Sequence, residues 1–237
     1  MVSKKFKRYA VLSILFFLPV VFLLMLIPAQ HNYVALDIVK ENVYEAEWKA
    51  PSSETIQLKD KITVLGFLGQ DPMGNVIETS NLKELIYDKF RGFKNFQIVL
   101  VASEGTEGEV EKLKENIIDY QTLEFLHFVQ SNSVETLNLY SSLNSKSPIK
   151  EDLSTSEVFI IDKELNQRGR LVDREENNDS KKGSSSLPSY NTLEVAEIKN
   201  KMSEDMRVLF TEYRQKRKGD FNSTVRRAED LGNTNGN

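Results

Sequence analysis

Hydrophobic runs of strand length alternate with amphipathic segments through the middle of the chain. The runs are nearly free of charge and rich in β-branched residues, a pattern typical of strands that are covered on both faces of a sheet. We expect a short strand at 55–58 and buried strands at 62–68, 96–102 and 123–129. The segments between them carry apolar residues at helical spacing, and we expect their helices to begin at Ser80 or Asn81, at Thr106 and at Ser133.

The C-terminal part of the chain continues this pattern and adds a hairpin. A strand is predicted at 157–162, and 168–173 is expected to pair with it. A long helix is predicted from 191 to 218, because apolar residues recur there every three or four positions. Strands that alternate with helices form parallel sheets through βαβ crossovers. The chain is therefore expected to have an α/β fold with a mainly parallel central sheet, followed by a C-terminal hairpin and helix.

An apolar run near the N-terminus is long enough to cross a bilayer. It extends from Tyr9 to Ile27, and as a helix its roughly 18 to 19 residues span about 27 Å, close to the thickness of the hydrocarbon core. Pro19 is expected only to kink this helix. A cleaved secretory signal is the alternative, but the residues after Ile27 make a poor cleavage site. Basic residues precede the run, so the positive-inside rule places the N-terminus in the cytoplasm and the chain after His31 outside it, in the periplasm of a Gram-negative bacterium.

These patterns divide the chain into five parts. They are a basic cytoplasmic N-terminus at 1–8, a transmembrane anchor at 9–27, a stalk at 28–54, a folded domain at 55–217 and a disordered tail at 218–237. Within the domain, 174–188 is almost free of apolar residues, which favours a mobile insertion.

The composition excludes several classes of function. The 237 residues carry a formal net charge of -4 with acids and bases intermixed, which argues against a nucleic-acid partner. There is no cysteine, and thiolates are the nucleophiles of disulfide exchange and the soft ligands of copper. Disulfide redox catalysis and thiolate capture of a metal are therefore excluded, whatever the fold.

Several short segments resemble one known family in their order and spacing. Val64–Leu68 followed by Asp71-Pro72 is similar to the family's strand that leads into a Cys-Pro-x-x-Cys-Pro loop. Val158–Asp162 with Gly169-Arg170 is similar to its Phe-Leu-Ile-Asp and Gly-Arg hairpin. From about 55 to 213, the chain resembles the Sco/SenC family of membrane-anchored copper chaperones of cytochrome c oxidase. The resemblance implies a thioredoxin-like (Sco-like) domain on one N-terminal transmembrane helix.

The departures from this family fall on its metal ligands. When the loops are aligned on Pro72, Asp71 and Asn75 stand at the two cysteine positions, and the family's metal-binding histidine falls at about Leu153 or Ser154. Met73 is the only soft donor nearby, and one thioether makes no copper site. The resemblance is therefore to a degenerate member, for which we expect no metal site and no cofactor. The loop of Asp71, Pro72, Met73 and Asn75 stays a candidate partner contact, because such sites gather at the carboxyl ends of strands in open α/β sheets.

Other candidate chemistry is sparse. The two histidines are His31, next to the apolar run, and His127, inside an apolar strand, so no imidazole pair is expected to complete a metal site. Ser103 follows a strand but lacks the Gly-x-Ser-x-Gly turn of a serine nucleophile. No catalytic residue is predicted, and the chain is not expected to be an enzyme.

A basic cluster, Tyr213–Lys218, ends the last predicted helix. Two interpretations stay open: the charges complement the helix dipole, or they contact anionic lipid headgroups.

The sequence thus predicts a non-catalytic, membrane-tethered protein that assists respiratory (cytochrome c oxidase) assembly or copper delivery. Its partners would be the inner membrane, through 9–27, and oxidase assembly or copper-delivery proteins. A generic envelope protein-interaction module unrelated to respiration is one alternative, and a metal carrier with atypical ligands is another.

Overall fold

The computed structural model describes residues 4–26, 35–49, 55–118, 123–172 and 186–219. The chain divides into two units, Met1–Val34 and Ala35–Asn237. The first contains helix α1, Lys4–Leu26, in which Lys7–Met25 has a mean hydropathy of 2.2 and is long and apolar enough to cross a membrane. The predicted N-terminal apolar helix is thus confirmed, while its insertion and orientation stay predictions.

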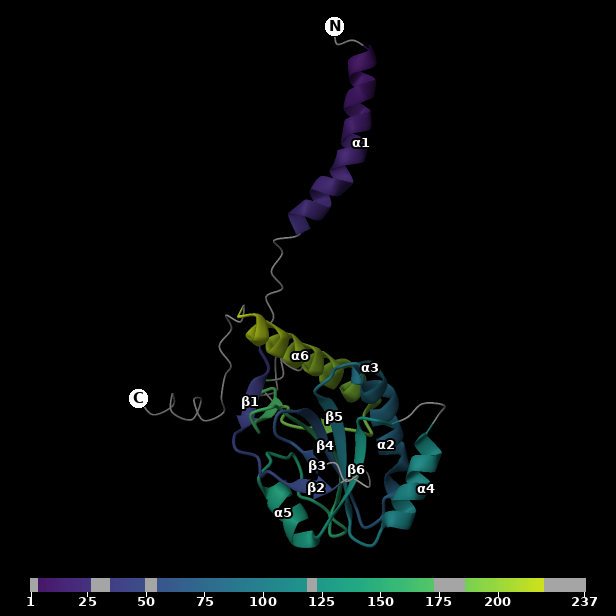
Figure 1. Ribbon diagram of the computed structural model, residues 1–237, viewed down its shortest axis with the longest axis vertical. Coiled ribbons are helices and arrows are strands. Elements are labelled where there is room, and N and C mark those ends of the chain that lie inside the picture. Colours follow the sequence, from purple (N-terminus) through teal and green to yellow (C-terminus); the bar gives the residue numbers. More distant parts are fainter. Residues whose placement is uncertain (1–3, 27–34, 50–54, 119–122, 173–185, 220–237) are drawn as a thin grey trace, which may run out of the picture. The chain divides into compact units, whose positions relative to one another are not determined.

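The second unit is built on one sheet with the strand order β1-β8-β7-β4-β5-β6 (Figure 1). The strands are β1 (Asp37–Lys40), β4 (Ile62–Gly69), β5 (Phe96–Ser103), β6 (Leu126–Ser131), β7 (Ser154–Ile161) and β8 (Gln167–Gly169). β4, β5 and β6 are parallel, whereas β7 lies antiparallel to β4, and β8 and β1 continue the antiparallel side. β9 (Tyr190–Asn191) pairs with β7, and β2 (Glu47–Lys49) with β3 (Thr55–Gln57) forms a separate antiparallel pair.

Both faces of the central strands are covered. Side chains alternate between the two faces of a strand, so neighbouring residues enter different clusters. Val64 and Ile98 belong to a cluster with residues of α2 (Val76–Leu82), α3 (Asp88–Phe90), α4 (Glu107–Ile117) and α6 (Ser203–Lys218). Leu65 and Val99 belong to a second cluster, with residues of α5 (Ser133–Ser141), β2 and β3. Because both faces of β4 and β5 are buried, these strands appear in the sequence as nearly continuous hydrophobic runs.

The arrangement is thioredoxin-like. Three parallel strands are connected through helices, an antiparallel strand lies beside the first of them, and the C-terminal helix packs its Met206 and Leu209 into the core. The predicted thioredoxin-like α/β fold is therefore confirmed, but the prediction of a mainly parallel sheet is wrong. Only β4, β5 and β6 pair in parallel, whereas β7, β8, β9 and β1 pair antiparallel, because the chain after β6 returns through hairpin pairings and β1 adds an antiparallel edge.

The segment predicted as a stalk differs from that prediction from residue 35 onward. β1 pairs with β8 at the edge of the main sheet, and Leu36, Ile38 and Val39 are buried. Asp37 interrupts the apolar pattern of this short strand, but it is buried too, and its Oδ2 accepts a hydrogen bond from the Leu171 amide (3.0 Å). This strand was not predicted, because it has only four residues and an acidic residue interrupts its hydrophobic pattern.

The helix after β4 begins earlier than predicted. A 3₁₀ turn at Met73–Asn75 leads into α2 at Val76, so Ser80 and Asn81 lie inside the helix and do not cap it. The Asn81 side chain instead donates to the Thr192 carbonyl (2.8 Å). A π-helical segment, Lys83–Tyr87, continues α2, and another, Glu197–Met202, precedes α6.

The predicted insertion and tail lie largely outside the described residues. At the end of the predicted insertion, Leu187 is buried and forms a β-bridge with Arg170. The tail is described only at Lys218 and Gly219, where Gly219 has a positive φ of 79° at the C-cap of α6.

Candidate functional site

The loop after β4 is a tight turn held by its own polar groups. Asp71 Oδ1 accepts a hydrogen bond from the Gly74 amide (2.9 Å). Asn75 is buried, and its Nδ2 donates to the carbonyls of Leu68 (3.1 Å) and Asp71 (2.9 Å). The hydroxyl of Thr79 donates to the Asn75 carbonyl (2.9 Å). The two residues predicted at the cysteine positions therefore stabilise the backbone of the turn.

The other two residues of the predicted loop contribute apolar contacts. Pro72 is buried, and Met73 is partly buried and packs against the core cluster that α2 and α4 share with the sheet. The one soft donor of this loop thus belongs to a side chain that is packed against the core.

The positions that the resemblance assigns to the missing histidine lie beside this turn. Leu68 of β4 is opposite Ser154 of β7, and the Gln70 amide donates to the Asp152 carbonyl (2.8 Å). Gly69 has a φ of +64°, and a Cβ at this position would lie 2.2 Å from the Asp152 carbonyl oxygen. Only glycine fits where these two loops meet.

Asp152 stabilises the loop that precedes β7. Its Oδ1 accepts hydrogen bonds from the amide (3.0 Å) and the hydroxyl (2.8 Å) of Ser154. Burial acts to raise the pKa of the Asp152 carboxyl, but the hydrogen bonds from Ser154 and the charge of Lys150 outweigh burial and hold this pKa below its ordinary value. Leu153, between Asp152 and Ser154, has a positive φ of 64°. A leucine side chain and a serine hydroxyl that is bonded to a carboxylate cannot replace an imidazole ligand.

These groups do not fit a copper ion. Aspartate oxygen and a primary amide are hard donors, whereas copper(I) prefers thiolate, thioether and imidazole. His127 lies on β6 opposite Val99, and His31 lies outside the described residues. Within the described ranges, no three histidine or acidic side chains gather closely enough to hold a metal ion.

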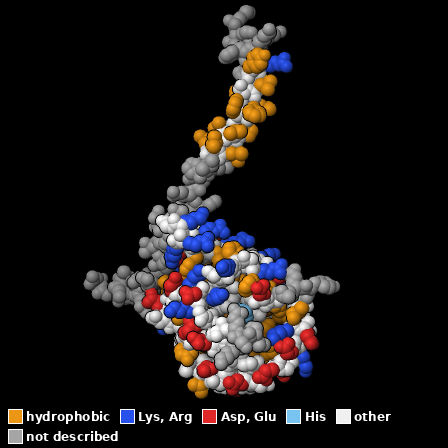
Figure 2. All heavy atoms as spheres, in the orientation of Figure 1, with side chains coloured by type: hydrophobic (Ala, Val, Ile, Leu, Met, Phe, Trp, Pro, Cys, Tyr) orange, Lys and Arg blue, Asp and Glu red, His pale blue; other side chains and the backbone are white. Residues whose placement is uncertain are grey.

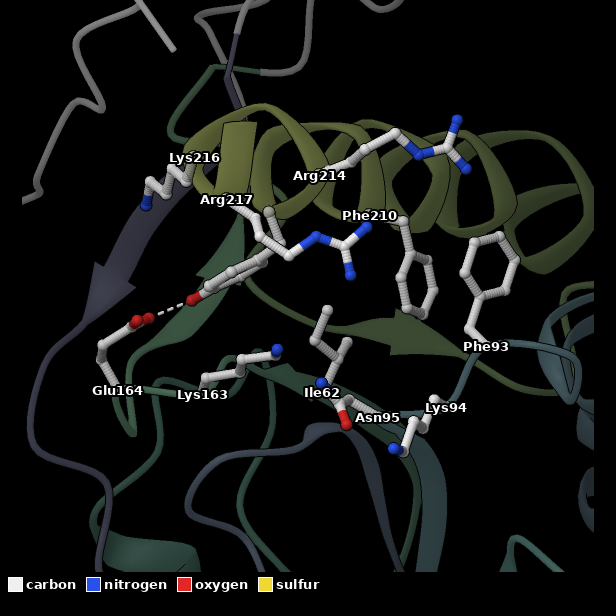
Figure 3. Close-up of a pocket in the computed structure, with 11 residues that line it drawn as sticks. Ile62, Phe93, Lys94, Asn95, Lys163, Glu164, Phe210, Arg214, Lys216 and Arg217 are labelled. Carbon is white, nitrogen blue, oxygen red and sulfur yellow. Dashed lines mark hydrogen bonds between the residues drawn. The ribbon is translucent and has the colours of Figure 1, made fainter. Parts of the chain in front are cut away.

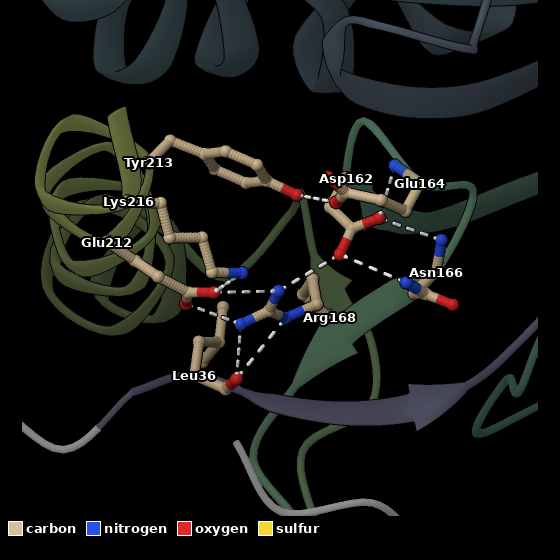
Figure 4. A network of polar contacts seen from close by, with 8 residues as sticks. All are labelled: Leu36, Asp162, Glu164, Asn166, Arg168, Glu212, Tyr213 and Lys216. Atoms are coloured by element: carbon tan, nitrogen blue, oxygen red, sulfur yellow. Dashed lines mark hydrogen bonds and ion pairs between the residues drawn. The ribbon is translucent and has the colours of Figure 1, made fainter. Parts of the chain in front are cut away.

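A buried ion network joins the β7–β8 turn to α6 and to the start of β1 (Figure 4). Arg168 of β8 is 1 % exposed, and its guanidinium donates to the carboxylates of Glu212 (2.6 Å) and Asp162 (2.9 Å) and to the Leu36 carbonyl (2.6 Å). Burial acts to lower the pKa of Arg168, but the two carboxylates outweigh burial and raise this pKa. The network fixes three segments that are far apart in sequence.

A second buried network lies further towards the N-terminal end of α6. Arg170 Nε donates to both oxygens of Asp205 (3.1 and 2.8 Å), and the Tyr190 hydroxyl donates to Asp205 Oδ2 (2.7 Å). Burial raises the pKa of the Asp205 carboxyl despite these donors, and burial next to Asp205 raises the pKa of Tyr190.

Neither network was predicted from the sequence, although α6 carries a signal for both. Asp205, Leu209 and Glu212 share the buried stripe of this helix, and acids on a buried stripe require partners.

Comparison with known proteins gives similarity at the level of structure. No protein-family model matches the chain, and no curated protein matches it. It is similar to BsSco, a member of the Sco family of cytochrome c oxidase assembly proteins, with 11% identity, a TM-score of 0.49 and coverage of 74% of this chain and 97% of that one. The soluble domain of Sco1 from Bacillus subtilis gives 12% identity, a TM-score of 0.44 and coverage of 73% and 97%. A putative thiol:disulfide interchange protein DsbE from Chlorobium tepidum gives 13% identity and a TM-score of 0.44, with coverage of 74% of this chain and 99% of that one.

At these identities the similarity concerns the fold alone. The strand order and the packing of α6 define that fold independently of the comparisons. The strand order and the packing of α6 thus give the chain a thioredoxin-like fold, and the chain carries this fold without a cysteine.

Proposed function

We propose that this chain is a non-catalytic binding protein whose thioredoxin-like domain is tethered to a membrane. The observation that carries the proposal is the turn after β4. Asp71 and Asn75 occupy the positions where the resemblance places thiolates, and the side chains of both form hydrogen bonds with the backbone of the turn. A loop without a thiolate, whose one soft donor Met73 is packed against the core, can present a surface to a partner, but it has no group to exchange disulfides and no ligand set for copper(I).

We propose respiratory oxidase assembly or copper delivery as the process in which the protein acts. The support is the sequence resemblance to the Sco/SenC family, from the strand before Asp71 to the Gly169-Arg170 hairpin. Residues 9–27 would anchor the protein in the inner membrane with the N-terminus in the cytoplasm, and the domain would face the periplasm.

Photocrosslinking in cells tests the partner. A photoreactive amino acid replaces Gln70 in the full-length protein, because this side chain is exposed at the turn. Cross-links to an oxidase subunit or to a copper-delivery protein are expected. The matched control replaces Lys112, which is exposed on α4. Cross-links to the same proteins from Lys112, or only to envelope proteins unrelated to respiration, would reject the proposed partner and favour a generic interaction module.

Deletion of the gene tests the process. Oxidase activity should fall in the deletion strain and return with the full chain. An unchanged oxidase level would reject the role in assembly. The anchor is tested by adding protease to spheroplasts, where digestion of the domain is expected and full protection would show the opposite orientation.

A further inference from the structure

A cavity of about 470 Å³ opens beside the C-terminal half of α6, away from the turn described above (Figure 3). Ile62, which begins β4, lies in its wall, whereas the Asp71 turn follows Gly69, which ends β4. An eight-residue strand is about 25 Å long, so the cavity and the turn are separate sites.

Basic residues are the largest group in the lining of this cavity. It contains one carboxylate and five basic side chains, which are Lys94, Lys163, Arg214, Lys216 and Arg217. The carboxylate is Glu164, which accepts a hydrogen bond from the Tyr213 hydroxyl. Figure 3 shows Arg217 and Lys163 facing the hollow, whereas Arg214 and Lys216 point away from it. The like charges of Arg217 and Lys163 repel one another across the hollow, and a bound anion relieves that repulsion.

Several of these cations have no carboxylate partner in the described part of the chain. Lys216 forms an ion pair with Glu212 (2.7 Å). Among the described residues, no ion pair or hydrogen bond joins the side chains of Lys94, Arg214 or Arg217 to a carboxylate. Positive charge is therefore left for a ligand to neutralise.

Aromatic rings form the rest of the wall. Phe93 and Phe210 stack with their centroids 4.2 Å apart, and Lys163 Nζ lies 5.1 Å from the centroid of Tyr213. Figure 3 shows the Arg217 guanidinium pointing from α6 into the hollow, with Lys163 on the opposite side. An apolar wall strengthens the attraction between these cations and an anion, because it reduces screening by water.

We propose that this cavity binds the phosphate group of an anionic phospholipid headgroup. Arginine and lysine are the side chains that recognise phosphate, and the arginine fork bonds two of its oxygens at once. The inference rests on the proposed insertion of α1 in a membrane.

The course of the chain favours a lipid as the source of the phosphate. The Leu36 carbonyl is held by Arg168, which also binds Glu212, one helical turn before Lys216. The chain therefore enters the domain beside the cationic end of α6. Eight residues, 27–34, separate Leu26 from Ala35, and an extended chain of that length spans at most about 30 Å.

The distribution of charge on the surface agrees with this assignment. Figure 2 shows Lys and Arg gathered over the end of the domain where α6 lies, and Asp and Glu mostly towards the other end of the same face. Headgroups within reach of a tethered site have a high effective concentration, so that a modest intrinsic affinity suffices.

Titration of the full-length protein in a neutral maltoside detergent tests this proposal. The probes are soluble short-chain phosphatidylglycerol, short-chain phosphatidylcholine and inorganic phosphate, with binding followed by thermophoresis. Phosphatidylglycerol is expected to bind, phosphatidylcholine is not, and inorganic phosphate is expected to bind at least about 10-fold more weakly, because it lacks the glycerol and acyl contacts. Arg217→Gln and Lys163→Gln should each weaken binding of phosphatidylglycerol by about 5-fold, the loss that corresponds to removal of one typical hydrogen bond to the phosphate.

Lys112→Gln, at an exposed position of α4, is the control that removes one positive charge elsewhere. Equal binding of the anionic and the zwitterionic lipid, or equal losses in Lys112→Gln and Arg217→Gln, would overturn the site. Phosphate that binds as tightly as phosphatidylglycerol would overturn the lipid as its source. The assay does not require insertion of the protein in a bilayer. The proposed anchor is therefore tested separately: release of the protein from membranes by alkaline carbonate would contradict the anchor without affecting the binding result.

Discussion

Arg168 and Glu212 form a buried ion pair that joins β8 to the C-terminal helix. The Nη2–Oε2 distance is 2.6 Å, and the two side chains are 1% and 0% exposed. Arg168 also pairs with Asp162, and Glu212 also pairs with Lys216, so the four ions compensate one another's charge as a group, since a lone ion in a protein interior is costly.

Arg168→Met is expected to lower the free energy of unfolding by about 3–5 kcal/mol, because it leaves the Asp162 carboxylate buried without its cation and leaves Glu212 with only the partly exposed Lys216. Urea unfolding of the full-length protein in detergent measures this through the fluorescence of Trp48, the only tryptophan, which is 6% exposed. Lys112→Ala on the surface should change stability by less than about 0.5 kcal/mol. A loss in Arg168→Met no larger than this control would show that the network does not stabilise the domain.

Gly69→Ala should destabilise the domain by about 1–3 kcal/mol, because the residue has a positive φ and the new Cβ would meet the Asp152 carbonyl. The matched control is Gly108→Ala on α4, where a Cβ meets nothing within 4 Å and alanine favours the helix. The two substitutions should therefore shift the urea midpoint in opposite directions. Shifts of the same sign and size would contradict the close contact between the two loops.

Asp152 should make stability fall in acid. Its pKa is held below the ordinary value of 3.8, so the folded protein favours the carboxylate more than the unfolded chain does. This contribution is complete above the unfolded pKa and is lost as the pH falls through the folded pKa. Asp152→Asn should be less stable than the wild type at pH 7, and the difference should shrink below about pH 4.

Urea unfolding at pH 7, 5 and 3 measures the dependence. Glu151→Gln is the control, because Glu151 is exposed and does not bond to Ser154. A stability difference between wild type and Asp152→Asn that stays constant from pH 7 to 3 would rule out the carboxylate as its source.

The full-length protein should not retain copper(I) against a moderate competing chelator, and it should have no disulfide reductase activity. Asp71 and Asn75 offer hard donors that are engaged in the turn, and no cysteine is present. Copper is measured after dialysis, with a Sco protein that has its cysteines as the positive control. Stoichiometric copper that is lost in Asp71→Ala or Met73→Ala would instead establish a carrier with atypical ligands.

The parts of the fold that sequence analysis predicts are those in which burial acts on long segments. The predicted strands at 62–68 and 96–102 match β4 and β5, because both faces of these strands are covered and every position except Gln97 is apolar or small. β1 was not predicted, because a buried Asp37 is compatible with a strand only through a hydrogen bond from Leu171, which becomes its neighbour only after folding.

The candidate site shows the same limit. The sequence assigned Asp71 and Asn75 to the missing ligand positions, but it did not reveal that their side chains hold the turn, or that Asp152 and Gly69 meet there. The partners of Arg168, which are Asp162, Glu212 and the Leu36 carbonyl, are six, 44 and 132 residues away along the chain, and no local periodicity encodes such distances.

The Leu36 carbonyl has a mechanical consequence for a tethered domain. Tension on the chain at Ala35 enters the sheet at β1, an edge strand with only β8 as its neighbour in the sheet order. Load on such a strand opens its hydrogen bonds from the end at which it is pulled. In a chain that is anchored through α1, as proposed above, Arg168 holds the backbone at that end and transfers the load through Glu212 to α6, so that the charged network protects β1 from being pulled off the sheet.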